Sequence, residues 1–312
     1  MKVTIMGAGA LGSVFGGFLS RQNEVALVGR KAHIQAIRRR GLQVSGLWGD
    51  HLFTDLKAQT SVDGLQIQDL VLITTKSYDT AQTVQQALPL LHAGSMVVSM
   101  QNGIGNEETV AAAVGRERTL GGMAIFGAVL VEPGHVEVTV YAAECKLGAL
   151  AGGQGRAEAM ARMFSACGIP TLPSPDILAE KWLKAFYNIA LNPLSAILRV
   201  PYGVLGEHEE TRAIMRQALE EAFAVAAAEG VNLKASAADY FRRLLQVQLP
   251  PTAQHRSSML QDIQRGKATE INYLNGLVVR LGQKHGIPTP VNGVLVNIVK
   301  VLEGRAANKG NC

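Results

Sequence analysis

A glycine-rich turn close to the amino end of this 312-residue chain constrains its fold more than any other feature. The turn has the pattern GxGxxG and consists of Gly7, Ala8, Gly9, Ala10, Leu11 and Gly12. It follows a short apolar segment that predicts a strand (residues 2–6) and opens a segment with helical apolar spacing (residues 10–21). With a second strand predicted at residues 24–28, this setting is typical of a dinucleotide-binding domain. A glycine-rich turn without a ligand is the alternative.

Each glycine of the turn has its own expected role. Gly7 permits the tight turn, Gly9 lets the backbone approach a pyrophosphate, and Gly12 lets the helix pack closely on the strand. The phosphates are expected at the helix amino terminus, where unpaired N–H groups and the helix dipole favour negative charge. We therefore predict that all six residues of the turn bind the cofactor.

The end of the second predicted strand indicates which dinucleotide is bound. An enzyme that uses NAD commonly carries Asp or Glu there to accept a hydrogen bond from the ribose 2′-OH, whereas NADP requires a cation. This chain has Arg30, followed by Lys31, and no carboxylate. An arginine can bind a 2′-phosphate through two parallel hydrogen bonds, which predicts NADP (NADPH) as the cofactor. A solvated surface arginine is the alternative.

Two further polar residues follow predicted strands of the same half. Lys76 comes after an apolar run that ends at residue 75, and Asn102 comes after another that ends at residue 100. The carboxyl ends of parallel strands share one edge of the sheet, where ligands bind. We expect both residues at the cofactor site, although a lysine at a helix start and an Asn-Gly turn would explain them without a ligand.

Strands and helices alternate over the first half of the chain, which predicts a mostly parallel sheet with right-handed crossovers. Further strands are expected at residues 69–74 and 95–100, and a helix at residues 80–91. From Met123 an apolar run, a Glu-Pro-Gly turn and alternating valines at 136, 138 and 140 predict a hairpin added to that sheet.

Three prolines within six residues (Pro170, Pro173 and Pro175) predict an extended linker, because they cannot continue a helix. Beyond them we expect helices at residues 177–198, 209–229, 237–248, 258–265, 269–285 and 291–303, and a frayed tail at residues 304–312. The predicted fold is α/β. A Rossmann-type, mostly parallel, NADP-binding domain spans residues 1–172, and an all-helical substrate and catalytic domain spans residues 173–312.

Composition excludes several classes of protein. Hydrophobic residues make up 47% of the chain and charged residues 18%, which excludes a disordered chain. The net charge of +5 is spread without a long basic run, so we expect no nucleic-acid partner and an anionic small molecule instead. Three cysteines without a CxxC pair, and seven histidines without metal-ligand spacing, predict neither a disulfide framework nor a metal site.

The apolar segment at the amino end has glycines throughout and no small-residue cleavage pattern, so it does not predict a signal peptide. No uninterrupted apolar run approaches the ~18 residues that span a membrane. We expect a cytoplasmic protein without a membrane partner, and leave a homodimer open.

A polar stripe lies on an otherwise apolar helix in the second half. Lys184, Asn188 and Asn192 are four residues apart, and at ~100° per residue they project from one face. A buried amide without partners costs about 1–3 kcal/mol, so the stripe should face a polar ligand or a dedicated network. A lysine reaching solvent and two amides that cap a neighbouring loop are the alternative. Pro193 is expected to disrupt the helix just beyond Asn192.

Ser257, Ser258, Thr269 and Glu270 form a second polar group near the carboxyl end. The serines have the character of helix-start residues, Thr269 can cap a helix, and Glu270 would then occupy its favoured first turn. The residues alone favour this structural interpretation at least as strongly as a catalytic one.

Together these segments resemble the ketopantoate reductase (2-dehydropantoate 2-reductase) family across essentially the whole chain. The motifs, in the family's order, are GAGALG at 7–12, lysine at 76, QNG at 101–103, KxxxNxxxNP at 184–193 and SSMLQD…TEI at 257–271. The resemblance implies NADPH as reductant, a 2-oxo acid as substrate, and reduction of ketopantoate to (R)-pantoate on the way to pantothenate and coenzyme A. It also implies that cofactor and substrate are held by different domains.

The resemblance further implies roles for residues of the second half. Lys184 matches the family's catalytic lysine, whose ammonium group can stabilise the developing oxyanion and donate the proton. Asn188, Asn192 and Ser258 match positions that contact substrate. Glu270 matches an acidic position close to the catalytic lysine and the bound ligands, which assigns it to catalysis and to cofactor binding.

In the first half, Asn102 matches a position near both the nicotinamide and the substrate. Arg30 and Lys76 match positions that hold the adenosine phosphate end of the cofactor. The chain departs from some family members at two positions. It has Tyr202 where they have an asparagine that contacts substrate, and His255 where they have an asparagine. These departures keep two alternatives open: a paralogous NADP-dependent dehydrogenase of another small 2-oxo or hydroxy acid, and an NADP-sensing protein without turnover.

Overall fold

The computed structural model describes the backbone of residues 1–309 and the side chains of residues 1–305. The chain divides into two compact units, of which the first is Met1–Leu178 and the second begins at Ala179. The boundary expected from the prolines lies between residues 172 and 173. The first unit extends further, because Thr171–Pro173 is a strand (β12) that pairs with Cys145–Ala149 (β11).

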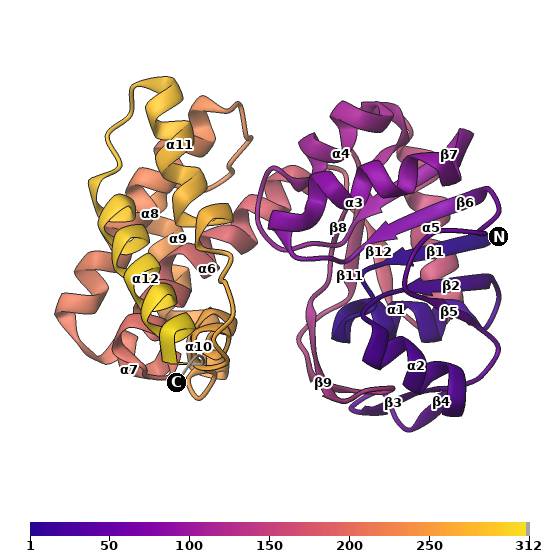
Figure 1. The fold of residues 1–312 in the computed structure, drawn as a ribbon. Helices are drawn as coiled ribbons and strands as arrows, with labels where there is room; N and C mark the ends of the chain where they lie inside the picture. The colour runs from indigo at the N-terminus through magenta and orange to yellow at the C-terminus, as the bar shows by residue number, and fades with distance from the viewer. Residues whose placement is uncertain (310–312) are drawn as a thin grey trace. The chain divides into compact units, whose positions relative to one another are not determined.

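Within the described residues, the main sheet of the first unit has eight strands in the order β12-β11-β8-β7-β6-β1-β2-β5 (Figure 1). Every neighbouring pair is parallel except β11 and β8, which confirms the predicted mostly parallel sheet. The strands not yet given are β1 (Lys2–Met6), β2 (Glu24–Val28), β5 (Lys57–Gln59), β6 (Gln68–Ile73), β7 (Leu91–Ser99) and β8 (Thr119–Met123).

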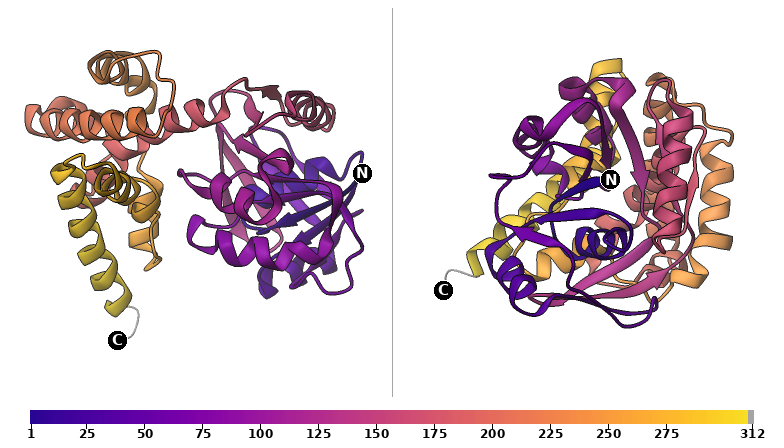
Figure 2. Two further views of the ribbon diagram at one scale, coloured as in Figure 1. Left: turned by 90° about the horizontal axis from the view of Figure 1, so that it is seen from above. Right: turned by 90° about the vertical axis from the view of Figure 1, so that its right-hand side faces the viewer.

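Helices cover both faces of this sheet (Figure 2). On one face, Val84 and Val110 from two helices pack against strand residues such as Val71. On the other face, Phe15 and Phe164 meet with ring centroids 5.8 Å apart. The helices of the unit are α1 (Ala10–Leu19), α2 (Lys31–Arg40), α3 (Thr80–Ala87), α4 (Asn106–Val114) and α5 (Gln154–Ala166).

The predicted hairpin forms, but its assignment to the main sheet is wrong. Its strands, β9 (Phe126–Glu132) and β10 (His135–Tyr141), belong to a separate sheet with the order β4-β3-β10-β9. The other two strands are β3 (Leu42–Gly46) and β4 (His51–Phe53). The alternation of valines determines which side of the hairpin is buried, but it carries no information about which strand pairs with it.

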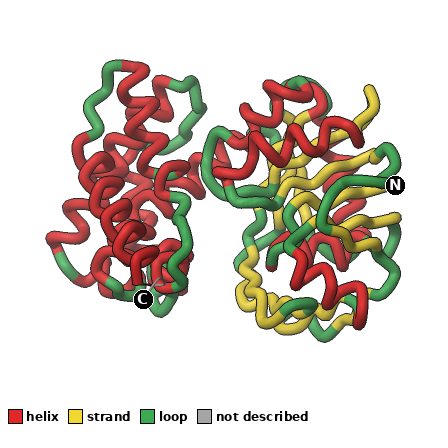
Figure 3. The backbone as a smooth tube through the Cα atoms, in the orientation of Figure 1, coloured by secondary structure: helices red, strands yellow, loops and turns green. Residues whose placement is uncertain are grey.

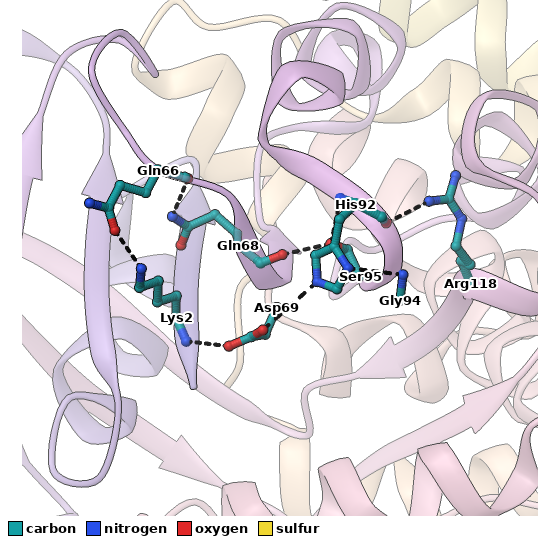
Figure 4. A network of polar contacts seen from close by, with 8 residues as sticks. All are labelled: Lys2, Gln66, Gln68, Asp69, His92, Gly94, Ser95 and Arg118. Carbon is teal, nitrogen blue, oxygen red and sulfur yellow. Dashed lines mark hydrogen bonds and ion pairs between the residues drawn. The ribbon is translucent and has the colours of Figure 1, made fainter.

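A polar network closes the sheet edge at which β1, β6 and β7 begin (Figure 4). The backbone N–H of Lys2 donates to Asp69 Oδ2 at 2.7 Å. Ser95 Oγ donates to the Gln68 carbonyl at 2.6 Å, and Arg118 Nη1 donates to the His92 carbonyl at 3.0 Å. These bonds occupy polar groups of neighbouring strands and loops with one another, so this edge has a structural role.

The second unit contains helices and no strand within the described residues (Figure 3). Its elements are α6 (Ile177–Leu198, which starts at the end of the first unit), α7 (Tyr202–Glu207), α8 (Glu209–Ala228), α9 (Ala237–Arg243, continued by a π-turn, Leu244–Gln248), α10 (Ser258–Gln264), α11 (Asn275–His285) and α12 (Pro290–Lys309). Among the described residues no helix is long and apolar enough to cross a membrane.

Three expectations for these helices are wrong. The helix predicted from residue 269 begins only at Asn275, because Ile271–Tyr273 forms a separate 3-10 turn and Leu274 has non-helical dihedral angles. The tail predicted from residue 304 continues α12 as far as Lys309, and the remaining residues 310–312 lie outside the described part. The disruption expected at Pro193 is absent, because α6 runs through it to Leu198.

Candidate active site

The glycine-rich turn is held tightly against the ends of β1 and β6. Gly7 has a φ of +107°, and a Cβ atom there would lie 2.7 Å from the backbone nitrogen of Thr75. A Cβ atom on Gly12 would lie 2.4 Å from the Gly7 carbonyl oxygen, so both positions require glycine. A Cβ atom on Gly9 would meet only that same carbonyl oxygen, at 3.9 Å. The backbone at Gly9 is therefore approachable by a ligand.

The amino terminus of α1 offers donors to an anion. The first bond of the helix joins the N–H of Ser13 to the Gly9 carbonyl at 2.9 Å. Ala10, Leu11 and Gly12 come before Ser13 in the helix, so their N–H groups lie ahead of its first hydrogen bond. The first turn carries no acidic side chain. Unpaired N–H groups and the helix dipole suit a phosphate, so the turn fits the pyrophosphate of a dinucleotide.

Arg30 lies beside this turn, directly after β2. The strand end is fixed there because the N–H of Ala8 donates to the Val28 carbonyl at 2.8 Å, and a Cβ atom on Gly29 would lie 2.8 Å from the Ala8 Cβ. Arg30 and Lys31 are both exposed at the start of α2, and no described residue forms an ion pair with Arg30. This donor set suits a phosphorylated ribose better than a free 2′-OH.

Lys76 and Asn102 follow the neighbouring strands β6 and β7 at the same sheet edge. The loop that carries Asn102 is held through its carbonyl oxygen, which accepts from Ser77 Oγ and from Asn106 Nδ2, both at 2.8 Å. Thr80 Oγ1 lies 2.8 Å from Asn106 Oδ1. These bonds bring the loops after β6 and β7 together.

Gln101 completes this buried network, because its Nε2 donates to Thr80 Oγ1 at 2.8 Å and to the Thr75 carbonyl at 2.9 Å. Of these residues, only Gln101 stands in a motif that the sequence singles out, QNG at 101–103. The sequence signal of Ser77, Thr80 and Asn106 is a cluster of polar residues after two apolar strands, which does not reveal that they bond one another.

His33 links α1 and α2 to the turn of the β9–β10 hairpin. The N–H of Gly134 donates to His33 Nδ1 at 2.9 Å, so the ring proton is assigned to Nε2, which lies 2.9 Å from Ser13 Oγ. The ring is buried, and burial lowers the pKa of His33 below its ordinary value of 6.5. The neutral ring is the form that the folded protein holds.

Acidification is therefore expected to destabilise the protein through His33. Because the folded pKa lies below the unfolded value, the unfolded chain binds more protons, and stability is lost as the pH falls from about 6.5 towards the folded pKa. We expect urea unfolding to show that the free energy of unfolding falls less between pH 7.5 and pH 5.5 in His33→Gln than in the wild type. His208→Gln, which changes an exposed histidine, is the matched control. An equal fall in the free energy of unfolding in all three proteins would contradict this role.

In the second unit, α6 carries Lys184, Asn188 and Asn192 at successive four-residue steps. Lys184 and Asn188 are half-buried, whereas Asn192 is only 4% exposed. The opposite side of the helix is anchored by Phe186, whose ring stacks on Phe223 of α8 with centroids 4.1 Å apart. This packing fixes the rotation of α6 and so fixes the face that carries the polar stripe.

Asn192 is held by Tyr202, one of the residues at which the chain departs from the family pattern. The Tyr202 hydroxyl donates to Asn192 Oδ1 at 2.6 Å, and burial raises the pKa of Tyr202 far above its ordinary value, so the hydroxyl stays protonated. The other departure, His255, contacts Tyr202 with ring centroids 5.3 Å apart. This bond uses the Asn192 oxygen as an acceptor, so the amide N–H group is the part of the side chain left for a further acceptor.

Removing this hydroxyl is expected to affect substrate binding more than cofactor binding. In Tyr202→Phe the Asn192 oxygen loses its donor, at a cost of about 1–3 kcal/mol, and the amide is free to turn. We expect the KM for the oxo acid to rise roughly tenfold, with the KM for NADPH unchanged. Tyr187→Phe is the control, because its hydroxyl bonds Thr252 instead. Equal effects of both variants would contradict the role of Tyr202.

The two adjacent serines have different environments. Ser257 is fully buried and caps α10, where its Oγ accepts from the Leu260 N–H at 3.0 Å and donates to the Asn192 carbonyl at 3.3 Å. Ser258 is exposed. The sequence predicts a helix-start role for both serines, and in the structure Ser257 has it. Ser258 has the accessibility that a substrate contact requires.

Glu270 is half-buried and lies at the start of the Ile271–Tyr273 turn. The segment is held on one side by Thr269, whose N–H donates to Glu303 Oε1 at 2.6 Å. On the other side Asn275 donates to the Ile189 carbonyl of α6 at 3.1 Å. The structure thus places the cofactor residues predicted in the first half of the chain along one sheet edge of the first unit. Glu270, the remaining predicted cofactor residue, lies in the second unit, where its segment is tied to α6.

The fold and the glycine-rich turn define a dinucleotide-binding protein of the Rossmann class. The family model described as "Ketopantoate reductase PanE/ApbA" matches residues 3–152, and "Ketopantoate reductase PanE/ApbA C terminal" matches residues 176–303. A 2-dehydropantoate 2-reductase of Aquifex aeolicus is 35% identical over 308 residues, which cover 97% of each chain. The chain belongs to the ketopantoate reductase family.

Solved structures agree with this assignment. A ketopantoate reductase from Ralstonia eutropha JMP134 superposes with a TM-score of 0.88 at 36% identity, covering 98% of this chain and 99% of the other. D-mandelate dehydrogenase, in a ternary structure with NADH and anilino(oxo)acetate, has a TM-score of 0.89 at 30% identity, with the same coverage of both chains. The same fold therefore occurs with another substrate and with NADH.

Proposed function

We propose that the protein reduces 2-dehydropantoate (ketopantoate) to (R)-pantoate with NADPH, a step towards pantothenate and coenzyme A. The observation that carries this proposal is the polar face of α6, with Lys184 and two amides on an apolar helix, in a chain that matches both family models. A protein that only senses NADP has no need of a proton donor on such a face. The proposed division of labour assigns residues 1–172 to the cofactor and residues 173–312 to substrate and catalysis.

NADPH fits the residues of the first unit. The open backbone at Gly9 and the first turn of α1 suit the pyrophosphate, and exposed Arg30 suits the 2′-phosphate. Lys76 and Asn102 are proposed to complete the site from the ends of β6 and β7. When bound, NADPH supplies the hydride that the oxo carbon accepts.

Residues of the second unit are proposed to supply the remaining chemistry. As the carbonyl carbon becomes tetrahedral, negative charge develops on its oxygen, and the Lys184 ammonium stabilises that charge and transfers a proton to it. Asn188, Asn192 and Ser258 hold the substrate, with Asn192 donating to a carboxylate or oxo oxygen. Glu270 is proposed to act beside Lys184 and the bound ligands, as its position in the family motif implies.

The similarity to D-mandelate dehydrogenase favours a second candidate, a dehydrogenase of another 2-oxo or hydroxy acid. A panel of 2-oxo acids, including ketopantoate and phenylglyoxylate, separates the candidates when kcat/KM is measured with NADPH and with NADH. We expect ketopantoate with NADPH to give the highest value. A preference for phenylglyoxylate would support the second candidate, and NADP binding without turnover on any acid would support a sensor.

We also propose a cytoplasmic homodimer. The odd cysteine count without a CxxC pair supports a reducing compartment. Val294, Ile298 and Val301 form a stripe on α12 that is 57%, 40% and 61% exposed, and such a stripe is typical of a surface covered by another protein copy. Light scattering after gel filtration should give twice the chain mass for the wild type and the chain mass for Ile298→Asp. A monomeric wild type would contradict the dimer.

A further inference from the structure

The catalytic helix α6 contains a defect that its own backbone cannot repair. Pro193 lies inside the helix, which continues to Leu198. Proline has no N–H group, so the carbonyl four residues earlier loses its helical donor. That carbonyl belongs to Ile189, which is 1% exposed, so water does not readily replace the missing bond. Ile189 lies between Asn188 and Asn192 in the sequence, so the defect falls in the part of α6 that carries the proposed substrate face.

Asn275 supplies the missing donor from another helix. Its Nδ2 lies 3.1 Å from the Ile189 carbonyl oxygen, across 86 residues of sequence. Asn275 is the first residue of α11 and is fully buried. The bond therefore replaces, from a neighbouring helix, the backbone hydrogen bond that Pro193 removes.

The direction of the Asn275 amide is fixed by a chain of acceptors. Asn292 Nδ2 donates to Glu221 Oε2 at 2.6 Å and to the Ala218 carbonyl at 3.0 Å, which are both acceptors only. Asn292 Oδ1 must then face Asn275, whose Nδ2 donates to it at 2.9 Å. The Glu221 carboxylate is itself held by the N–H groups of Val291 and Asn292 at 2.9 and 3.0 Å.

Both N–H groups of Asn275 are thus used, while its Oδ1 is buried without a hydrogen-bond partner among the described residues. An unpaired buried oxygen is costly, so this position is organised around the donor and not around the acceptor. An apolar residue of similar size would avoid the unpaired oxygen, but it would leave the Ile189 carbonyl without a donor.

We propose that Asn275 is a positioning residue of the reaction. It holds α6 in helical form through Pro193, and thereby keeps Asn188 and Asn192 on the face that carries Lys184. Because Asn275 follows Glu270 by five residues, the same bond fixes that segment against α6. The kinetic part of this inference rests on the proposed function, whereas the structural part does not.

The test is a double-mutant cycle between Asn275 and Pro193. Asn275→Ala is expected to raise the KM for ketopantoate about tenfold and to leave the KM for NADPH within about twofold. Pro193→Ala restores a backbone N–H to the Ile189 carbonyl, so in the double variant the ketopantoate KM should return to within about threefold of the wild type. The Tm should recover only partly, because Asn292 Oδ1 still lacks its donor. Asn272→Ala, an exposed asparagine in the same segment, is the matched control.

Each outcome decides the proposal. The proposal is overturned if the ketopantoate KM rises equally in Asn275→Ala and in the double variant. It is also overturned if Asn275→Ala raises the KM values for ketopantoate and NADPH equally. Either result would assign Asn275 a general packing role. If Asn275→Ala is insoluble, the proposal requires the double variant to be soluble, and insolubility of both overturns it. If the wild type reduces no oxo acid, the proposed function fails, while the recovery of Tm in the cycle still tests the bond to Ile189.

Discussion

Replacing Lys184 with alanine is expected to lower kcat for ketopantoate reduction by about 10²–10⁴-fold, the usual contribution of a positioned general acid. The KM for NADPH should not change, because the residues proposed to bind NADPH's phosphates belong to the first unit. Lys184→Arg should also be strongly impaired, because a guanidinium keeps the charge but gives up its proton far less readily. The loss of NADPH absorbance, followed in the steady state or by stopped flow, measures kcat for both variants and the KM for NADPH.

The control for this prediction is Lys300→Ala, which removes an exposed lysine from α12. It should behave as the wild type, and all variants should keep the wild-type circular dichroism and Tm. A loss of kcat below about tenfold in Lys184→Ala would contradict the acid role, because it lies below the range expected for general acid catalysis.

The second large effect is expected at Arg30. Arg30→Ala should raise the KM for NADPH roughly 10- to 100-fold, since it removes charge-assisted hydrogen bonds to the 2′-phosphate. The KM for NADH should change little, because NADH lacks that phosphate. Arg30→Asp should go further and prefer NADH, because a carboxylate at this strand end accepts from the ribose 2′-OH and repels a phosphate.

Arg39→Ala is the matched control, because Arg39 lies at the far end of the same helix and its only described side-chain bond is to the Gln35 carbonyl. It should leave both cofactor constants unchanged. The similarity to D-mandelate dehydrogenase, which is solved with NADH, makes the cofactor preference of the wild type a direct test. A wild-type kcat/KM with NADH equal to that with NADPH would refute the assignment of Arg30.

The sequence predicted those parts of the fold that depend on local order. A strand, a glycine turn and a helix in succession impose the geometry of β1 and α1, and alternation of strands and helices imposes a parallel sheet. Strand-end residues such as Lys76 were placed correctly at one edge because parallel strands share their direction. The partner of the β9–β10 hairpin could not be predicted, because the pairing of β10 with β3 joins segments about 90 residues apart.

Long-range hydrogen bonds account for what the sequence missed in the second unit. Pro193 predicts a helix break, and the break is prevented by Asn275, which a local pattern cannot connect with it. The bond between Tyr202 and Asn192 likewise joins two helices across a turn. Both bonds decide how the α6 face is presented, so the sequence could nominate the residues of that face but not the contacts that orient them.

The most direct test of the central claim follows the hydride itself. Purified protein is incubated with ketopantoate and NADPH deuterated at C4, in separate reactions with the 4R and the 4S label. The account predicts (R)-pantoate equal in amount to the NADPH consumed, with one deuterium at C2 from one of the two labels, and almost none with Lys184→Ala. Oxidation of NADPH without labelled pantoate, or undiminished labelled product from Lys184→Ala, would contradict it.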